Sequence, residues 1–205
     1  MSLKHWSDAL EHHWGIKAAL RPLDGEYDLN FMAEAEDGSG YVLKAMRPGC
    51  EEGLVDMQVR AFQHIAESHP DLPCPRVIPA LDGTAMLTIT DESGAQRLVW
   101  LLERLPGLCY AKSEPKTAEL IQEIGSVLGA TGKALKGFQH PGLERDFKWD
   151  LMRAGWVGSE LDSIKEPQKQ ALIGGIETEF SRLEPVLQSL PKQAIHNDAN
   201  DYNIL

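Results

Sequence analysis

IHNDANDYNIL, residues 195–205, carries the sharpest signal in this 205-residue chain. It places His196 two residues before Asp198, and Asn203 five residues after that aspartate. Three of the four asparagines of the chain lie within the stretch. Its polar centre has apolar residues on both sides, which predicts a polar loop between two buried strands.

The order of these polar residues is that of the catalytic loop of kinases. A hydroxyl that accepts a phosphoryl group needs a carboxylate within hydrogen-bond reach to orient it and take its proton, and Asp198 is the candidate. Asn203 offers the hard oxygen that Mg²⁺ prefers, while nucleotide phosphates supply other ligands. His196 is expected to brace the loop by hydrogen bonding. The expected number of accidental matches is about 0.01, which disfavours the alternative of an ordinary polar loop.

Two weaker signals lie earlier in the chain. Lys44 ends the strand-like segment Tyr41-Val42-Leu43-Lys44, from which a lysine can reach nucleotide phosphates. Taken alone, it is more often a solvent-facing strand residue. The turn Asp24-Gly25-Glu26 offers backbone N–H groups that can cover phosphates. It has one glycine rather than three, so a plain hairpin is the alternative.

The chain is β-rich first and helical afterwards, which favours an α+β protein with two lobes over an alternating βα sheet. Pro106-Gly107 is the expected boundary between an N-terminal lobe, 1–105, and a helical lobe, 106–205. Strands are predicted over 16–23, 27–35, 41–47, 85–90 and 96–105, and helices over 2–14, 51–68, 113–136 and 165–190.

Helical spacing also predicts which side chains the last three helices bury. These are Leu54, Met57, Ala61, Phe62 and Ile65 in 51–68, then Leu120, Ile121, Ile124, Val127 and Leu128 in 113–136, then Leu172, Ile176, Phe180, Leu183 and Leu187 in 165–190.

Charge and composition limit the kinds of molecule that this protein is expected to bind. The 31 acidic and 20 basic residues give a net charge of −11, which opposes binding to nucleic acid or anionic membrane and suits a cationic small substrate. Solubility alone is the alternative explanation. No apolar run approaches the roughly 18 residues of a membrane span, and the N-terminus lacks a signal-peptide core, so the expected location is cytoplasmic. The three widely spaced cysteines indicate neither a disulfide framework nor a zinc site.

Taken in order, residues 23–31, 41–44, 101–107 and 195–205 resemble the aminoglycoside phosphotransferase family, the small-molecule branch of the protein-kinase-like fold. The match covers essentially the whole chain. The chain is most similar to the hydroxylysine-kinase-like branch, which includes domains fused to class III aminotransferases. Phe138-Gln139-His140-Pro141 and the later run Arg145-Asp146-Phe147-Lys148-Trp149-Asp150 carry that similarity.

The resemblance implies a bilobal fold with ATP or GTP between the lobes, the base against the hinge from Glu103 to Leu105 and the phosphates near Lys44. Acceptor and Mg²⁺ are expected at Asp198 and Asn203. The implied acceptor is a small amino-alcohol or amino acid such as hydroxylysine, or an aminoglycoside-like molecule. The resemblance also implies a fusion to, or partnership with, an aminotransferase, and it leaves the oligomeric state open. Trp149-Asp150 either lines the acceptor side or caps the following helix.

Two departures from the family pattern stand out. The glutamate that usually partners the lysine is replaced by Gln58, which can hydrogen-bond an ammonium but adds no charge; Glu51, Glu52 or Asp56 are the alternatives. A second Mg²⁺-binding aspartate is expected after the catalytic loop and falls beyond Leu205, so we expect an incomplete helical lobe and a truncated chain.

Two other functions compete with the kinase. One is a non-catalytic nucleotide-binding or regulatory module, which Gln58 and the missing aspartate favour and Asp198 with Asn203 oppose. The other is a metal hydrolase using His196 and Asp198, which the lack of a helical histidine pair with a nearby acid disfavours.

Overall fold

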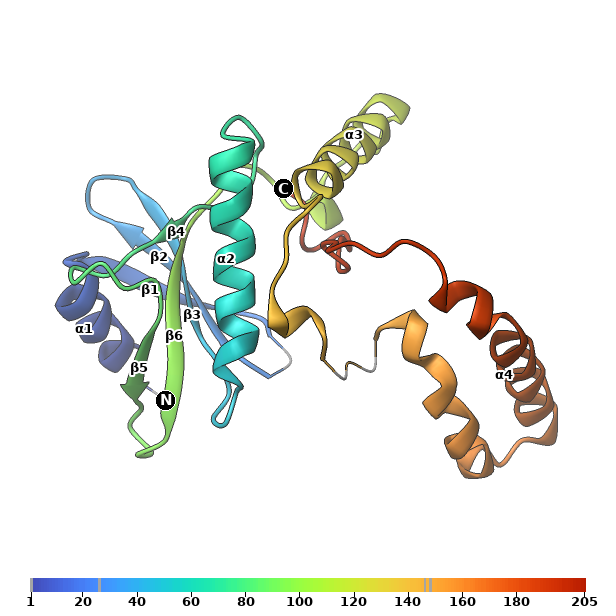
Figure 1. Ribbon diagram of the computed structural model, residues 1–205. Coiled ribbons are helices and arrows are strands. Elements are labelled where there is room, and N and C mark those ends of the chain that lie inside the picture. The colour runs from blue at the N-terminus through green and yellow to red at the C-terminus, as the bar shows by residue number, and fades with distance from the viewer. Residues whose placement is uncertain (1, 26, 146, 148) are drawn as a thin grey trace. The chain divides into compact units, whose positions relative to one another are not determined.

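The structure is a computed structural model that describes residues 2–25, 27–145, 147 and 149–205. It contains two compact units, Met1–Leu143 with Ala194–Leu205, and Glu144–Gln193. The first unit holds the β-sheet and the second is helical (Figure 1). The predicted α+β composition is therefore confirmed, whereas the lobe boundary after residue 105 stays a prediction.

A six-stranded antiparallel sheet forms the centre of the first unit. Its order is β1-β2-β3-β6-β4, with β5 also paired to β6. The strands are β1 (Ala18–Leu23), β2 (Leu29–Ala35), β3 (Gly40–Ala45), β4 (Val77–Ile78), β5 (Leu87–Thr90) and β6 (Gln96–Glu103). Five of them lie where the sequence predicts strands, and β4 is too short for its pattern to be recognised.

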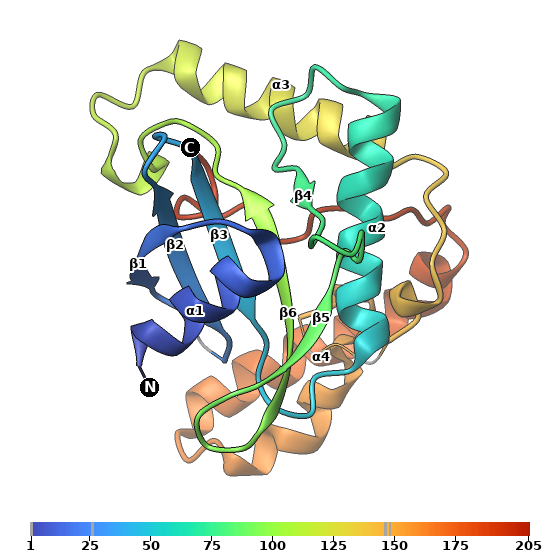
Figure 2. The ribbon, with the colours of Figure 1, turned by 90° about the vertical axis from the view of Figure 1, so that its left-hand side faces the viewer.

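Two helices cover opposite faces of this sheet (Figures 1 and 2). Helix α1 (Leu3–Trp14) begins at Ser2, whose hydroxyl caps the first turn, and ends at Gly15 with a left-handed φ of 70°. It buries Trp6 and Leu10 against the sheet. Helix α2 (Glu52–Ser68) packs Val55 and Val59 against the other face. The sheet is therefore shielded from solvent on both sides over much of its area.

Helix α2 buries two faces, so the prediction of one apolar face was wrong. Val55, Val59 and Phe62 pack against the sheet, whereas Met57, Ala61 and Ile65 pack against the residues that follow the next helix, including Leu135 and Phe138. The reason is that α2 lies between two layers, so apolar side chains are needed on both sides of it.

Helix α3 (Ala118–Ala134) forms within the predicted range, with Thr117 capping its start. Its predicted apolar face is only partly covered: Leu120 and Ile124 are half-buried, whereas Ile121 is 55% exposed, and Val127 and Leu128 are 38% and 37% exposed. Within the described residues of its unit, only its C-terminal end is buried, through Ala134. Helical periodicity predicts which side chains share the apolar face of α3, but not which part of the protein would cover that face. The short 3₁₀ helices η1 (Tyr110–Lys112) and η2 (Pro141–Leu143) lie on either side of α3 in sequence.

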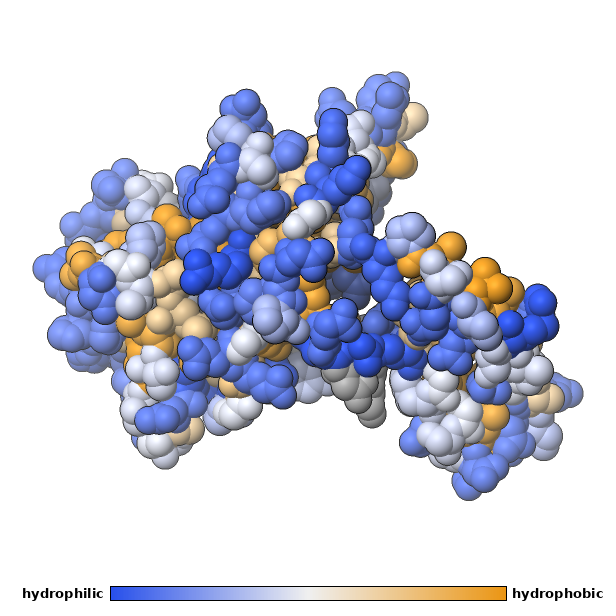
Figure 3. All heavy atoms as spheres, viewed as in Figure 1, coloured by the Kyte–Doolittle hydropathy of each residue, from blue (hydrophilic) through white to orange (hydrophobic). Residues whose placement is uncertain are grey.

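The second unit pairs the 3₁₀ segment η3 (Leu151–Ser163), which the sequence did not predict, with α4 (Pro167–Gln188). Gln170 Nε2 donates to the Leu161 carbonyl at 3.2 Å, which joins the two. The predicted buried face of α4 is wrong at Leu172 and Ile176, which are 66% and 63% exposed, whereas Phe180 and Leu187 are half-buried. Figure 3 shows hydrophobic side chains on the surface of this helix. Among the described residues, no helix combines the length and apolar character that crossing a membrane requires.

Candidate functional site

Lys44 lies on the face of the sheet that α2 covers. Side chains alternate along β3, so Leu43 and Ala45 enter the core beneath α1, while Val42 and Lys44 project to the α2 side. The Lys44 Nζ atom lies 5.9 Å from the centroid of the Trp100 ring. Burial lowers the pKa of the ammonium, and the charge of Asp28 acts in the opposite direction. Lys44 thus provides a partly desolvated positive charge, which suits a phosphate-binding group.

The turn at Gly25 joins β1 to β2, and position 25 has no room for a side chain. A Cβ atom at Gly25 would lie 2.6 Å from Asn30 Nδ2 and 2.8 Å from the Asp28 carbonyl oxygen. Asp28 in turn accepts the Arg47 backbone N–H at 2.8 Å. Glu26, part of the predicted turn, lies outside the described residues. The role of this turn in covering phosphates stays a prediction.

The alternatives for a partner of Lys44 on α2 can now be compared. Gln58 is half-buried, and Glu51 and Glu52 are exposed. Asp56 binds elsewhere, since its Oδ2 lies 3.0 Å from His140 Nε2 and its Oδ1 lies 3.4 Å from Arg60 Nε. In this structure the Asp56 carboxylate is therefore directed at His140 and Arg60, and the identity of a Lys44 partner on α2 stays a prediction.

The predicted hinge follows the last strand of the sheet. Glu103 ends β6 and its N–H donates to the Arg76 carbonyl at 2.8 Å, while the Arg104 N–H donates to the Gly40 carbonyl at 2.9 Å. The N–H of half-buried Leu105 makes no hydrogen bond to another described residue. It is a donor that an adenine or guanine ring can use.

A pocket of 370 Å³ adjoins Glu103 but opens on the other side of the sheet from Lys44. Tyr41 and Ile78 line it, and both pack against the core beneath α1. Because Lys44 projects to the α2 side, this pocket and Lys44 do not share one ligand site.

The terminal loop orients Asp198 through two asparagine amides. Asn200 Nδ2 donates to Asp198 Oδ1 at 2.8 Å, and Asn203 Nδ2 donates to Asp198 Oδ2 at 2.9 Å. The Asp198 N–H lies 3.4 Å from His196 Nδ1, a long contact, and Asn197 has a left-handed φ of 64°. The loop folds around the carboxylate, which remains exposed.

The strands predicted on either side of this loop are absent. Residues 191–200 have no regular structure, and Ile195 is 60% exposed. A strand needs a partner for its backbone hydrogen bonds, and no described segment pairs with these residues.

The loop instead docks on the segment that follows the hinge. The N–H groups of Tyr110 and Ala111 donate to the carbonyls of Ile204 and Asp201, each at 2.8 Å. A Cβ atom at Gly107, where φ is 143°, would lie 3.2 Å from Leu205 Cβ. These contacts place the loop in the same compact unit as Lys44 and beside the chain that leaves β6. No local sequence pattern indicates this contact, because the two segments lie far apart along the chain.

Asn203 fits the role of a ligand to a hard cation. Its Nδ2 donates to the Asp198 carbonyl at 2.8 Å as well as to the Asp198 carboxylate, so its Oδ1 points away from both. An amide oxygen is the kind of donor that Mg²⁺ accepts. The part of the chain that the structure describes holds no cluster of three or more His, Cys, Asp or Glu residues suited to a metal ion. The phosphates of a bound nucleotide are the further oxygen donors in such a site.

Trp149 and Asp150 belong to the second unit. Asp150 Oδ1 accepts the Met152 N–H at 3.0 Å and so caps the start of η3, whereas the Trp149 side chain is 74% exposed. Of the two interpretations of Trp149-Asp150, the helix cap is the one that a hydrogen bond supports.

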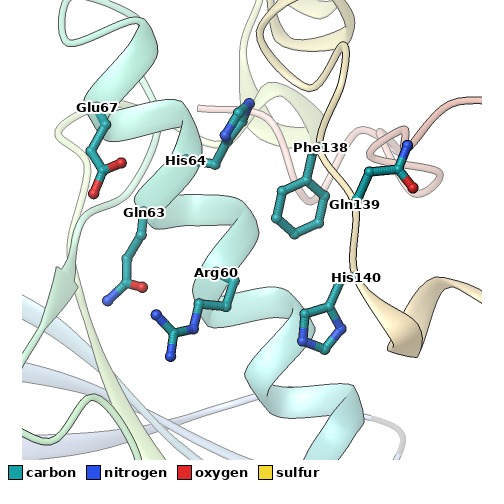
Figure 4. Close-up of a pocket in the computed structure, with 7 residues that line it drawn as sticks. All are labelled: Arg60, Gln63, His64, Glu67, Phe138, Gln139 and His140. Carbon is teal, nitrogen blue, oxygen red and sulfur yellow. The ribbon is translucent and has the colours of Figure 1, made fainter.

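A second pocket, of 300 Å³, lies between α2 and residues 138–140 (Figure 4). None of the predicted site residues lines it. His64 and His140 lie on either side of Phe138, with ring centroids 5.5 Å and 6.4 Å from that of the phenylalanine.

An antiparallel sheet between two helices, followed by helices and by an Asp198–Asn203 loop docked after the last strand, defines a kinase-like fold. Residues 19–205 match the model of the phosphotransferase enzyme family. The chain belongs to that family. This confirms the resemblance to aminoglycoside phosphotransferases at family level, while the hydroxylysine-kinase-like branch stays a prediction.

Solved structures share the fold at low sequence identity. A complex of amicoumacin kinase with AMP-PNP, Ca²⁺ and Ami matches 94% of this chain with 14% identity and a TM-score of 0.65. A microcompartment-associated aminopropanol kinase matches 73% of it with 20% identity and a TM-score of 0.54. An aminoglycoside phosphotransferase from Alicyclobacillus acidocaldarius matches 89% with 11% identity and a TM-score of 0.52.

This chain spans about half the length of these proteins, covering 55%, 45% and 53% of them respectively. No curated protein matches its sequence.

Proposed function

We propose that this chain carries the nucleotide-binding sheet and the catalytic loop of a small-molecule kinase. The enzyme transfers the γ-phosphate of ATP or GTP to a hydroxyl group of a small acceptor. The observation that carries the proposal is the Asp198 carboxylate held between the amides of Asn200 and Asn203, in a chain of the phosphotransferase family.

Asp198 acts on the acceptor. Each of its oxygens accepts one amide N–H, which leaves a second acceptor position on each oxygen for the substrate hydroxyl. The carboxylate orients that hydroxyl in line with the phosphoryl group and takes its proton as the new O–P bond forms. Because the two amides fix the carboxylate, less orientational freedom is lost when the acceptor binds. His196 braces the loop.

Other residues hold the nucleotide. Lys44 binds its phosphates, and the N–H groups of the Gly25 turn cover them. The base lies against the hinge at Glu103 and Leu105, where the Leu105 N–H is available as a donor. Asn203 Oδ1 would hold Mg²⁺, which neutralises charge on the phosphates when bound.

The acceptor in this proposal is a cationic amino-alcohol or amino acid. Two observations support it: the net charge of −11, which favours cationic ligands, and the names of the similar structures, which include an aminopropanol kinase. Hydroxylysine is the candidate that the branch resemblance favours. An aminotransferase fused to or bound by the enzyme, and a cytoplasmic location, belong to the same proposal.

The test is a screen of the protein against hydroxylysine, ethanolamine, choline, aminopropanol and aminoglycosides, with ATP and GTP in turn and Mg²⁺ present. Acceptor-dependent release of ADP or GDP is expected. Asp198→Asn should lower the rate by about 10²–10⁴-fold because it removes the base, while AMP-PNP binding remains. An equal rate in this variant would show that Asp198 is not the base.

A nucleotide-binding module without catalysis is the second candidate. It is favoured by Gln58, which leaves Lys44 without an acidic partner on α2. Thermal stabilisation by AMP-PNP, with no turnover of any acceptor, would support the module and exclude the kinase.

A further inference from the structure

Three side chains form a row across the sheet, with Lys44 at its centre. In the strand register, Asn30 of β2 pairs with Lys44 of β3, and Lys44 pairs with Trp100 of β6. Residues directly opposite one another on antiparallel strands project to the same face, with Cβ atoms about 4.5–5.5 Å apart. The row therefore lies on the face that α2 covers.

Each member of this row has unused hydrogen-bonding capacity. Asn30 Oδ1 and Trp100 Nε1 are buried and make no hydrogen bond to described residues. The Lys44 ammonium forms no ion pair within the described residues and contacts the Trp100 ring instead. Most buried polar atoms have a hydrogen-bond partner. Asn30 Oδ1 is an unpaired acceptor on the residue directly opposite Lys44, whose ammonium has N–H donors available, so the two groups can bond to each other.

The carboxylate whose charge acts on Lys44 comes from the sheet side and not from α2. Asp28 precedes Asn30 by two residues, and its negative charge raises the pKa of Lys44 against the effect of burial. Arg47 holds the Asp28 carboxylate, with its N–H at 2.8 Å and its Nη1 at 3.8 Å from Oδ1. Besides Arg47, a second arginine, Arg97 of β6, lies near the end of β3. Its ion pair is with Asp91, with Nε 2.6 Å from Oδ2.

We propose, resting on the proposed function, that Asn30 and Asp28 are the positioning residues of Lys44. Asn30 Oδ1 accepts a hydrogen bond from the Lys44 ammonium when the nucleotide draws it from the Trp100 ring, and Asp28 supplies the countercharge. Together they take the role of the glutamate that usually partners the lysine in this family. This chain has Gln58 on α2 at the position of that glutamate. Gly25 belongs to the same arrangement, because a side chain there would displace the Asn30 amide.

Titration of Lys44 tests the proposal without any need for catalysis. The full chain is treated with an amine-specific reagent across a pH series, and modification of Lys44 is followed by mass spectrometry. Asp28→Asn should lower the pKa of Lys44, since it removes the negative charge that favours the ammonium. The Asn30 hydrogen bond forms only with nucleotide present, so Asn30→Leu is tested by nucleotide binding. A fold that was merely loosened would hydrate Lys44 and raise its pKa, so the direction separates the two explanations.

Gln58→Leu is the matched control on α2 and should leave the titration of Lys44 unchanged. The proposal fails if Asp28→Asn has no effect on the pKa of Lys44 or raises it, or if Gln58→Leu lowers that pKa as much as Asp28→Asn does.

Binding of AMP-PNP gives the second readout. Asn30→Leu should weaken it about tenfold, the scale of one hydrogen bond to a charged group, while Gln58→Leu leaves it near the parent value. If Gln58→Leu weakened AMP-PNP binding and Asn30→Leu did not, the positioning role would belong to α2. If neither the parent nor any variant bound the nucleotide, the proposed function would fail, and the titration would still decide whether Asp28 is the countercharge of Lys44.

Discussion

Asp91 shows how one residue can hold a turn together. It is buried in the β5–β6 turn and accepts the Ser93 hydroxyl at 2.5 Å, the Arg97 Nε–H at 2.6 Å and the N–H groups of Ser93 and Ala95 at 2.8 Å and 3.1 Å. The Ser93 hydroxyl and then the Arg97 guanidinium hold the pKa of Asp91 far below its usual range. The ionised form is therefore strongly favoured in the folded protein.

We predict that Asp91→Asn lowers the Tm at neutral pH and that the difference from the parent shrinks in acid. Because the pKa of Asp91 is depressed by folding, its contribution is complete above the unfolded pKa of about 3.9 and is lost as the pH falls below that value. The amide resembles the protonated acid, so the Tm values of parent and variant should approach each other below about pH 4. Thermal unfolding from pH 7 to pH 2.5 measures this. A Tm difference that stayed constant over that range would contradict it.

At the scale of elements, η2 fixes helix α2 from the side away from the sheet. The Gly142 N–H donates to His140 Nδ1 at 3.0 Å, so Nε2 is the nitrogen that carries the proton and donates to Asp56 on α2. A Cβ atom at Gly142 would lie 2.6 Å from the Gly53 carbonyl oxygen and 3.0 Å from Met57 Cβ. Backbone and side chain approach each other too closely there for any residue but glycine.

We therefore predict that Gly142→Ala destabilises the protein by about 1–3 kcal/mol, the range for overpacking at a close contact. Chemical denaturation followed by circular dichroism gives the free energy of unfolding. An unchanged value would mean that η2 can shift away from α2 at little cost.

Gly125→Ala in α3 is expected to act in the opposite direction. Gly125 is exposed, and nothing lies within 4 Å of a Cβ atom built on it. Alanine there should stabilise the protein by about 0.5–1 kcal/mol, because glycine loses more conformational entropy in a helix. The same denaturation experiment measures it, and a destabilised variant would show that α3 has a close neighbour at this position.

At the scale of the whole molecule, the main feature is the apolar surface that α3 and α4 expose. Ile121, Leu172 and Ile176 are between 55% and 66% exposed, and hydrophobic residues are visible on both helices in Figure 3. Apolar side chains grouped on one helix face bind hydrophobic dyes and promote association. The net charge of −11 acts against that association.

The double variant Leu172→Lys and Ile176→Lys should bind less of a hydrophobic fluorescent dye and scatter less light than the parent, with unchanged helix content. The reason is that both side chains lie on the surface of α4, so lysine replaces exposed apolar area without opening a cavity. Loss of helix content in circular dichroism would indicate that this face is buried in solution.

Local sequence patterns determined much of this protein. The β-rich first part and the four long helices were predicted within a few residues. The order of His196, Asp198 and Asn203 pointed to the family that the chain belongs to. These features follow from neighbours in sequence, because propensities, caps and loop motifs act over a few residues.

The tertiary structure decided which faces are buried and which polar groups meet. Periodicity indicated apolar faces on α2, α3 and α4, but the partners of those faces lie far away in the chain. The second buried face of α2 and the exposure of Ile121, Leu172 and Ile176 were therefore not predicted. The docking of the terminal loop on Tyr110 and Ala111, and the row of Asn30, Lys44 and Trp100, likewise depend on strand register and on contacts across tens of residues. Hydrophobic pattern and turn geometry set the register of each hairpin, but which polar side chains of several strands meet on one face is decided only when the strands pair in the sheet.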